Sequence, residues 1–307
     1  MRAIPEFTLQ GGMGGAIGLR NPITDDFIRK HNLRCGVESL EMLMRKHLQP
    51  HIMCGVGDVA RYVLLSGDPR RVERIAAFFD DNVKVGDYRG FVTYTGSVEG
   101  IGVSACSTGI GCPSAAIVVE ELAKIGAETL IRVGTTGSLQ PEAEVGDIVI
   151  APAAVRGDGT SRNYVPIGYP AVADFNVTTA LFQAAKESKR KVHFGTVLTS
   201  DAFYGDVDIL KRWSRFNVLS VEMECSAIFT LSKLRKLKAG AILAVDSKPL
   251  MGRMKGEFEP GQKTGELNDS VQKAIEEEIQ AAVEALKILE NETMKESRKK
   301  GNAKLGQ

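Results

Sequence analysis

The sequence has almost no net charge. Its 307 residues contain 39 Lys and Arg against 38 Asp and Glu, which gives a formal charge of +1 at pH 7. A chain without a global positive field does not attract nucleic acid or an anionic membrane surface. A small or neutral partner is therefore favoured. The 43% hydrophobic and 25% charged content excludes a disordered chain, a collagen and a disulfide-stabilised miniprotein.

Cysteine, histidine and long apolar runs are also scarce. The five cysteines are an odd number without a C-x-x-C spacing, which is typical of free thiols in a reducing compartment. The four histidines stand at no metal-binding interval from cysteines or carboxylates, so we expect no metal. No apolar run approaches the roughly 20 residues of a membrane span, and the N-terminus has no apolar signal-peptide core. We expect a cytoplasmic protein. The cysteines are Cys35, Cys54, Cys106, Cys112 and Cys225.

Strand and helix patterns alternate from Tyr62 onward. Short apolar segments followed by amphipathic stretches predict a single α/β domain with a largely parallel or mixed sheet. The expected strands are residues 62–66, 101–107, 129–133, 147–151, 196–199 and 241–245. The expected helices begin near residues 69 and 113, cover 221–234, and end the domain with an apolar face of Val271, Ile275, Ile279, Val283 and Leu286.

The two ends of the chain differ in composition from this domain. Residues 1–50 contain the glycine-rich segment 11–15 and polar residues of mixed charge, without strand and helix alternation. We therefore interpret them as an N-terminal extension. The glycines are interpreted as a flexible linker and not as a dinucleotide-binding loop, because no β-branched strand precedes them. We assign residues 51–294 to the domain and residues 295–307 to a polar C-terminal tail.

Three predicted strands run into glycine-containing corners. In open α/β sheets, ligands bind at the carboxyl ends of strands, where glycine lets backbone N–H groups approach an anion and helix N-termini favour negative charge. Arg71 and Arg132 lie beside two corners and suit a phosphate-sized oxyanion, with Thr135 as a hydroxyl donor. Plain turns and surface arginines are the alternative, although Arg132 stands in an apolar strand, where an unpaired charge is costly. The corners are residues 67–71, 108–111 and 132–137.

Acidic residues follow two later apolar segments. Glu222 and Glu224 stand where residues 221–227 enter a predicted helix, so one carboxylate can face inward and accept both hydroxyl protons of a sugar diol. Alternatively, the negative charges of both acids only stabilise the N-terminal end of the helix by interacting with its dipole. Asp246 follows the strand 241–245, where α/β enzymes place functional side chains, or it caps a turn.

Two further features have open interpretations. His51 is either a ligand contact or, more commonly, a surface or capping residue. Phe203 and Tyr204 either stack on a planar ring or belong to the core. Residue types alone do not decide between these roles.

Six segments together resemble the hexameric-type nucleoside phosphorylases. This superfamily contains uridine phosphorylase, which the sequence resembles most, and the purine nucleoside phosphorylases of bacteria, archaea and protozoa. The resemblance runs from about His51 to the terminal helix, and it implies a central mixed, partly barrel-like β-sheet flanked by helices. The segments, in the order of the family, are 67–72 (GDPRRV), 107–114 (STGIGCPS), 131–138 (IRVGTTGS), 155–161 (VRGDGTS), 169–175 (YPAVADF) and 221–224 (VEME).

The resemblance implies roles for individual residues. Inorganic phosphate would be held by Gly67, Arg71, Arg132, Thr135 and, from a neighbouring subunit, Arg89. The ribose would be bound by Met223, Glu224 and, at its 5′-hydroxyl group, His51 of a neighbouring subunit. The base pocket would be lined by Thr136, Gly137, Phe203 and Glu222. A site shared in this way requires at least a dimer, and family analogy implies a homohexamer built as a trimer of dimers.

The implied enzyme is a pentosyltransferase of nucleoside salvage. Phosphate would attack the anomeric carbon as the base leaves, and the reversible reaction would give free base and ribose 1-phosphate. Arg132, Glu224 and Asp246 would be the catalytic residues. The implied reaction needs no covalent enzyme intermediate and no metal. It also needs no cofactor, because inorganic phosphate is a co-substrate. Hydrolysis by a nucleosidase and nucleoside binding without catalysis are the alternatives.

Base preference is open between two substrate classes. Residues 155–161 and 169–175 are closest to uridine phosphorylase and favour uridine. In that branch, however, Phe-Tyr is followed by a Gly-Gln-x-Arg sequence that reads uracil, and here residues 205–208 are Gly-Asp-Val-Asp. Asp246 lies near the place of an aspartate that assists the leaving base in purine-cleaving relatives, so purine nucleosides or 5′-methylthioadenosine are the alternative. Gly90 replaces the glutamate that binds potassium in the pyrimidine branch, so we expect no such ion.

Overall fold

The described strands form one mixed 12-stranded sheet in the computed structural model. The structure describes residues 48–253 and 269–305, so residues 1–47 of the predicted N-terminal extension lie outside the described residues. The strands are β1 (Tyr62–Ser66), β2 (Asp81–Tyr88), β3 (Phe91–Val98), β4 (Ile101–Ser107), β5 (Thr129–Ser138), β6 (Ile148–Ile150), β7 (Ala153–Gly157), β8 (Ala171–Val172), β9 (Val192–Phe194), β10 (Val197–Ser200), β11 (Ser220–Glu222) and β12 (Lys238–Ser247).

Parallel pairing brings the carboxyl ends of four strands to one edge of the sheet. β1 pairs in parallel with β4 and β5, and β5 pairs in parallel with β12. Arg132 of β5 lies between Leu65 of β1 and Ala241 of β12 in this register. Antiparallel pairs such as β2–β3, β5–β11 and β6–β12 make the sheet mixed.

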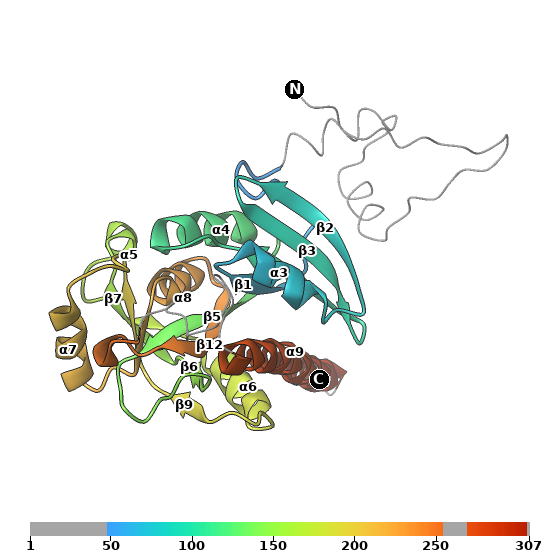
Figure 1. The fold of residues 1–307 in the computed structure, drawn as a ribbon. Helices are drawn as coiled ribbons and strands as arrows, with labels where there is room; N and C mark the ends of the chain where they lie inside the picture. The colour runs from blue at the N-terminus through green and yellow to red at the C-terminus, as the bar shows by residue number, and fades with distance from the viewer. Residues whose placement is uncertain (1–47, 254–268, 306–307) are drawn as a thin grey trace. The chain divides into compact units, whose positions relative to one another are not determined.

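Helices cover both faces of the sheet, which confirms the predicted α/β architecture. They are α3 (Pro69–Ala76), α4 (Cys112–Lys124), α5 (Thr160–Tyr164), α6 (Phe175–Ala185), α7 (Val207–Arg215), α8 (Cys225–Leu234), the 3-10 helix Pro249–Met251 and α9 (Asp269–Leu305). In Figure 1, α4 and α8 lie on one side of β5 and β12, and α6 and α9 lie on the other. One apolar core includes Leu122 and Phe229 of the first pair, and a second includes Leu181 and Ile279 of the other. Among the described residues, no helix combines the length and apolarity of a membrane span.

Two of the three predicted glycine corners are turns into helices. After β1, the Asp68 carboxylate accepts a hydrogen bond from the N–H of Arg70 at 2.9 Å, and Pro69 takes the first position of α3. After β4, Gly109 and Gly111 have φ angles of +65° and +89° before α4 begins. Residues with a Cβ rarely adopt such angles, so glycine is needed at both positions.

The third predicted corner is wrong. β5 does not turn at residues 134–137, because β12 pairs with it from Thr129 to Gly137 and keeps the strand extended to Ser138. Gly134 is needed here for a different reason. A Cβ at this position would lie 2.9 Å from the Cζ of Arg132, so the guanidinium group rests directly against the glycine backbone.

Several other elements differ from the sequence expectation. Residues 221–234 are not one helix, because β11 ends at Glu222 and α8 begins at Cys225. Asp246 does not follow a strand but lies inside β12, at a register shift between Val245 and Ser247. α9 is helical to Leu305, and the division into a domain of residues 51–294 and a polar tail of residues 295–307 stays a prediction.

The hairpin of β2 and β3 was not predicted. Its turn consists of Arg89 and Gly90, since Tyr88 pairs with Phe91. Both turn residues have positive φ angles, +54° and +85°. Two-residue turns of this kind match the right-handed twist of the flanking strands. The hairpin therefore presents Arg89 at its tip.

Candidate active site

A buried arginine occupies the carboxyl edge of the sheet. Arg132 projects from β5 and is only 4% exposed. Its Nε atom lies 3.0 Å from Oε2 of Glu222, and its Nη2 atom forms an ion pair with Glu224. Burial alone would lower the pKa of Arg132, but the carboxylates of Glu224 and Glu222 outweigh burial and raise the pKa above its ordinary value. The guanidinium group is therefore permanently charged and held by two anions.

Glu222 anchors the beginning of α8. Its Oε2 accepts the backbone N–H of Glu224 at 2.7 Å and of Cys225 at 2.9 Å, and its Oε1 accepts the hydroxyl of Thr199 at 2.6 Å. Its side chain has no exposed surface. The helix-terminus interpretation therefore describes the contacts of Glu222, and a contact with the base stays a prediction.

Glu224 links Arg132 to a glycine corner. Its Oε1 accepts the backbone N–H of Gly111 at 2.6 Å, while the carboxylate also pairs with Arg132. The neighbouring Met223 is half-buried, and its carbonyl oxygen accepts the thiol of Cys112 at 3.3 Å. The predicted ribose-binding pair therefore lies against the first turn of α4.

The predicted phosphate-binding residues of one chain lie at this same edge. A Cβ on Gly67 would lie 3.3 Å from the carbonyl oxygen of Gly109, so the corners after β1 and β4 nearly touch. The side chain of Arg71 is 10% exposed, and its Nη1 lies 3.5 Å from Oε1 of Glu278. Thr135, on β5, is half-buried. Two arginines and two glycine corners therefore converge where β1 and β4 end, beside the middle of β5.

Glu278 is a member of this cluster that the sequence analysis missed. It lies on α9, is fully buried, and is influenced by Arg71, Arg132 and Asp246. Burial raises its pKa to about 8, although the two arginines oppose this shift. Helical spacing contains the signal, because Glu278 stands three residues after Ile275 on the apolar face. Because Glu276 and Glu277 directly precede it, the sequence does not show which of the three carboxylates points inward.

The predicted base-binding residues differ in exposure. Thr136 is buried, and its hydroxyl donates to the carbonyl oxygen of Val221 at 2.8 Å. Gly137 closely approaches the next strand, since a Cβ there would lie 3.0 Å from Oγ of Ser247. Phe203 is 43% exposed and meets the ring of Tyr204 edge to face, with 5.0 Å between ring centroids. An exposed aromatic ring is available for stacking on a planar ligand.

Asp246 lies across from two of these base-binding residues. Val245 pairs with Thr136 and Ser247 with Gly137, and Asp246 occupies the register shift between them. Its side chain is half-buried, and its Oδ1 accepts the hydroxyl of Ser247 at 2.9 Å. The carboxyl group is therefore near both the predicted base pocket and the arginine cluster.

His51 and Arg89 were predicted to act across a subunit interface. The Nδ1 atom of His51 lies 2.6 Å from Oε1 of Glu121, and Oε2 of Glu121 accepts the backbone N–H of His51 at 3.1 Å. Glu121 is buried in α4 and fixes the imidazole ring, a role that was not predicted. Arg89 is exposed, with its Cζ 5.9 Å from the ring centroid of Tyr88. Contacts of both residues with a neighbouring subunit stay predictions.

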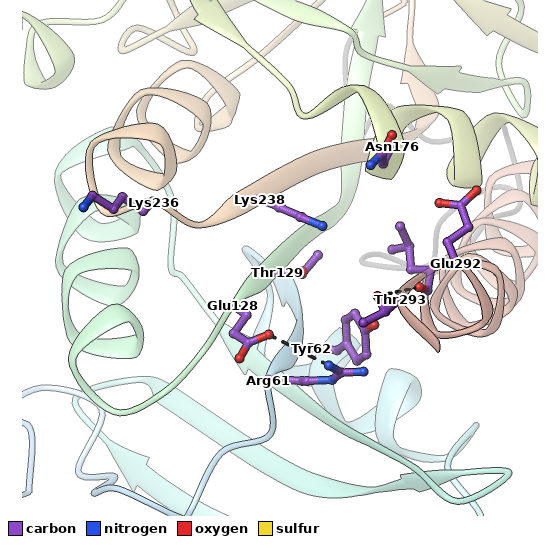
Figure 2. A pocket seen from close by; sticks show the side chains of 10 residues that line it. Arg61, Tyr62, Glu128, Thr129, Asn176, Lys236, Lys238, Glu292 and Thr293 are labelled. Carbon is purple, nitrogen blue, oxygen red and sulfur yellow. Dashed lines mark hydrogen bonds and ion pairs between the residues drawn. The ribbon is translucent and has the colours of Figure 1, made fainter. Parts of the chain in front are cut away.

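A cavity at the opposite edge of the sheet contains none of these residues. It encloses about 230 Å³ where β1, β5 and β12 begin. Figure 2 shows Arg61 and Glu128 on one side of it and Glu292 of α9 on the other. Arg61 is already paired with Glu290 and Glu128. We therefore assign the candidate active site to the arginine cluster at the carboxyl edge.

The fold and the site together define the class of the protein. Parallel strands that end at glycine corners and a buried arginine–carboxylate cluster are typical of α/β proteins that bind an oxyanion ligand at the carboxyl edge of the sheet. Residues 61–287 match the phosphorylase superfamily. The chain belongs to this superfamily, which confirms the family resemblance predicted from the sequence motifs.

Relatives within the superfamily include both pyrimidine and purine enzymes. The chain is 43% identical over 238 residues to the uridine phosphorylase of Thermococcus kodakarensis, covering 72% of this chain and 83% of the relative. It is 41% identical over 228 residues to the guanosine phosphorylase of Halorubrum lacusprofundi, covering 74% and 95%. The solved structure of uridine phosphorylase from Vibrio fischeri is similar with a TM-score of 0.73 at 31% identity, covering 80% of this chain and 98% of that chain.

Proposed function

We propose that this protein uses inorganic phosphate to cleave the N-glycosidic bond of a nucleoside, reversibly, giving free base and ribose 1-phosphate. One observation carries the proposal: Arg132 is buried and charged at the carboxyl edge, with Arg71 beside the glycine corner after β1 at the same edge. The planar fork of arginine matches a tetrahedral oxyanion. A nucleosidase, which uses water, has no need of an anion site built from arginines.

Catalysis follows from charge placed beside the sugar. The transition state carries positive charge on the ribose and growing negative charge on the base, so a phosphate ion fixed next to the anomeric carbon stabilises it. The carboxylate of Glu224, which binds Gly111 and Arg132, is the acceptor group that we propose for the ribose hydroxyls, because an ionised carboxylate accepts several hydrogen bonds at once. A single displacement inverts the anomeric carbon and needs no Ser–His or Cys–His pair.

The remaining roles follow from the family. Additional phosphate contacts are proposed for Gly67, Thr135 and, from a neighbouring subunit, Arg89. The ribose is also bound by Met223 and by His51 of a neighbouring subunit. The base pocket is lined by Thr136, Gly137, Phe203 and Glu222. Phosphate is a co-substrate and no cofactor takes part. The functional unit is a homohexamer with sites shared across dimer interfaces, and a fully active monomer in sedimentation analysis would contradict this assembly.

A cytoplasmic location is supported by the thiols. Cys54, Cys106, Cys112 and Cys225 are free and buried. Burial raises the pKa of Cys54 to about 11 and that of Cys106 to about 12. Because the thiolate is the reactive form, these cysteines are inert and suit a reducing compartment. Cell fractionation tests this location.

Uridine is the proposed substrate because two of the similar proteins carry the name uridine phosphorylase. The test is a panel of uridine, thymidine, inosine, adenosine and 5′-methylthioadenosine, each with and without phosphate. We expect base and ribose 1-phosphate to form only with phosphate, and fastest from uridine. Free ribose formed without phosphate would identify a nucleosidase, and binding without turnover would leave a nucleoside-binding protein.

Purine nucleosides are the second candidate, and Asp246 favours them. Its half-buried carboxyl lies opposite Thr136 and Gly137 of the predicted base pocket. In addition, Asp206 caps α7 by accepting the N–H of Asp208 at 2.9 Å, where uridine-specific relatives read uracil through Gln and Arg. The guanosine phosphorylase of H. lacusprofundi is a relative with the corresponding name.

Replacing Asp246 with asparagine distinguishes the two base classes. If Asp246 assists a departing purine, we expect Asp246→Asn to lower kcat/KM for inosine by about 10²-fold, since general acid catalysis contributes about 10²–10⁴-fold. Cleavage of uridine should change far less, and the uridine rate of the same preparation controls for folding. Equal losses on inosine and uridine would remove Asp246 from base recognition.

A further inference from the structure

Glu278 places a carboxyl group at a core position. It lies on the face of α9 that carries Ile275, Ile279 and Ala282, all of them buried, and no part of Glu278 itself is exposed. Acidic side chains are almost never fully buried unless they are paired. Its surroundings must therefore explain why an apolar residue does not fill this position.

Charged groups act on Glu278 from three elements. Arg71 of α3 is in contact, with 3.5 Å between Nη1 and Oε1. Arg132 of β5 and Asp246 of β12 act on it electrostatically. The surfaces of α6 and β4 that pack into the same core are apolar, as at Leu181. The carboxyl group therefore faces the anion site and the backbone N–H of Ala244 in β12.

The pair formed by Glu278 and Arg71 is loose. Its 3.5 Å separation exceeds the distance of about 2.7–2.9 Å of a strong charge-assisted hydrogen bond. Within the described part of the chain, neither oxygen of Glu278 has a hydrogen bond of good geometry. Arg132, by contrast, lies 3.0 Å from Glu222 and also pairs with Glu224. An incoming anion can therefore take over the donors of Arg71, and it can also reach Nη1 of Arg132, which has no hydrogen bond within the described part of the chain.

An incoming anion changes the charge balance of this cluster. Carboxyl groups already outnumber guanidinium groups here, so a bound phosphate ion adds negative charge that protonation of a carboxylate relieves. Burial raises the pKa of Glu278 to about 8, against the opposing effect of the two arginines, so in the empty site this carboxyl is protonated below pH about 8 and ionised above it. The carboxyl groups are Glu222, Glu224, Asp246 and Glu278, and the guanidinium groups are Arg71 and Arg132.

We propose that Glu278 is a positioning residue of the phosphate site: in its ionised form it holds Arg71 while the site is empty, and from that form it takes up one proton from solvent when inorganic phosphate binds. The inference rests on the proposed function, because it requires phosphate at Arg71. Protonation frees the guanidinium group for the anion. Phosphate affinity is then highest below pH about 8, where Glu278 is already protonated. Above this pH the affinity falls by up to about tenfold per pH unit, because binding requires a proton whose concentration falls with rising pH.

The test compares three proteins. Glu278→Gln keeps the shape of the protonated side chain but cannot titrate. Glu276→Gln is the matched control, because Glu276 lies on the same helix, is 61% exposed, and pairs with an arginine of α3, Arg74, at 3.6 Å. The KM for phosphate and kcat are measured at saturating nucleoside from about pH 6 to about pH 10, a range that spans the titration.

We expect the KM for phosphate to rise above pH about 8 in the wild type and in Glu276→Gln, approaching about tenfold per pH unit, and to lack this rise in Glu278→Gln. The kcat profiles should stay parallel. Ionisation of phosphate itself affects all three proteins equally and cancels in the ratios. Identical KM profiles for Glu278→Gln and the wild type would reduce Glu278 to a structural residue.

Calorimetry provides a second readout that does not need turnover. Phosphate binding in two buffers of different ionisation heat, at about pH 9, should show uptake approaching one proton by the wild type and about one fewer by Glu278→Gln. The wild-type count is decisive even if a variant folds poorly, because zero uptake would overturn the inference. If phosphate binds and the nucleoside is cleaved, but the wild type and Glu278→Gln take up equal numbers of protons, this inference alone is overturned. Absence of phosphate binding to the wild type would overturn the proposed function as well.

Folding of the variant is itself predictable. The pKa of Glu278 is raised from its ordinary value of 4.5 to about 8, so this group favours the folded state less as pH rises between these values. Removing the titratable group removes that loss. Glu278→Gln should therefore melt at no lower temperature than the wild type at alkaline pH, and a melting curve is recorded beside each kinetic measurement.

Discussion

Replacing Arg132 with alanine is expected to reduce phosphate-dependent kcat/KM by at least about 10³-fold, because loss of one preorganised group at the reacting charge costs about 10²–10³-fold and Arg132 also positions its neighbours. It is 4% exposed and sits between Glu222 and Glu224 at the carboxyl edge. Its loss would remove a proposed hydrogen-bond donor to phosphate and the cation that pairs with Glu224, the proposed ribose-binding carboxylate. Formation of ribose 1-phosphate is the measurement.

Stability has to be separated from catalysis in this experiment. Alanine leaves two buried carboxylates without their cation, and breaking a buried pair costs about 3–5 kcal/mol. Arg132→Lys is therefore measured as well, since lysine keeps the charge but cannot present the planar fork that bridges two anions. We expect the lysine variant to fold and still lose most of its activity. Normal turnover by either folded variant would show that the anion site is elsewhere.

Local signals predicted the first two corners correctly. Asp68 and Pro69 are adjacent in the chain and closely follow the apolar strand β1. Together they form a helix-start signal, and in the structure Asp68 caps α3 and Pro69 begins it. The corner with Gly109 and Gly111 likewise depends on residues adjacent in the chain. Such features are predictable because the residues that cause them are neighbours in sequence.

The corner predicted at residues 134–137 is absent because of a segment far away in the sequence. Glycines after a short apolar segment predict a turn, but β12, far along the chain, pairs with these residues and keeps β5 extended. The partners of Arg132 are equally remote, because Glu222 and Glu224 arrive from the junction of β11 and α8. Sequence patterns indicated that Arg132 needed a partner without showing which acids supply it.

Unequal exposure within a run of like charges is also hidden in the sequence. Residues 276–278 are all glutamate, yet the third is fully buried against Arg71 while the first is 61% exposed. Only the phase of α9 against the sheet distinguishes them. Similarly, the buried acid that holds His51 is Glu121 of α4, which follows another glutamate, Glu120, that pairs with Arg235 on the surface.

Replacing Glu224 with glutamine is expected to lower kcat/KM for uridine by about 10–10²-fold, since a hydrogen bond to a charged group contributes about 1.5–3 kcal/mol. Glutamine keeps the volume of the side chain next to Gly111 and Arg132. It replaces one acceptor oxygen with a donor NH₂ group, however, and the single uncharged oxygen that remains accepts the ribose hydroxyls more weakly than the carboxylate does. Initial rates at saturating phosphate are the measurement.

Sugar discrimination shows whether Glu224 touches the ribose. 2′-Deoxyuridine offers one hydroxyl fewer, so Glu224→Gln should penalise uridine more than 2′-deoxyuridine and shift the ratio of their kcat/KM values by at least about tenfold, the lower limit for one hydrogen bond to a charged group. Glu222→Gln is the matched control, because Glu222 is also buried and also pairs with Arg132, but its oxygens bind Thr199 and the N-terminus of α8. It should lose activity without changing the sugar ratio. If Glu224→Gln leaves the ratio unchanged as well, Glu224 serves only as a counter-ion of Arg132, and another group must hold the ribose.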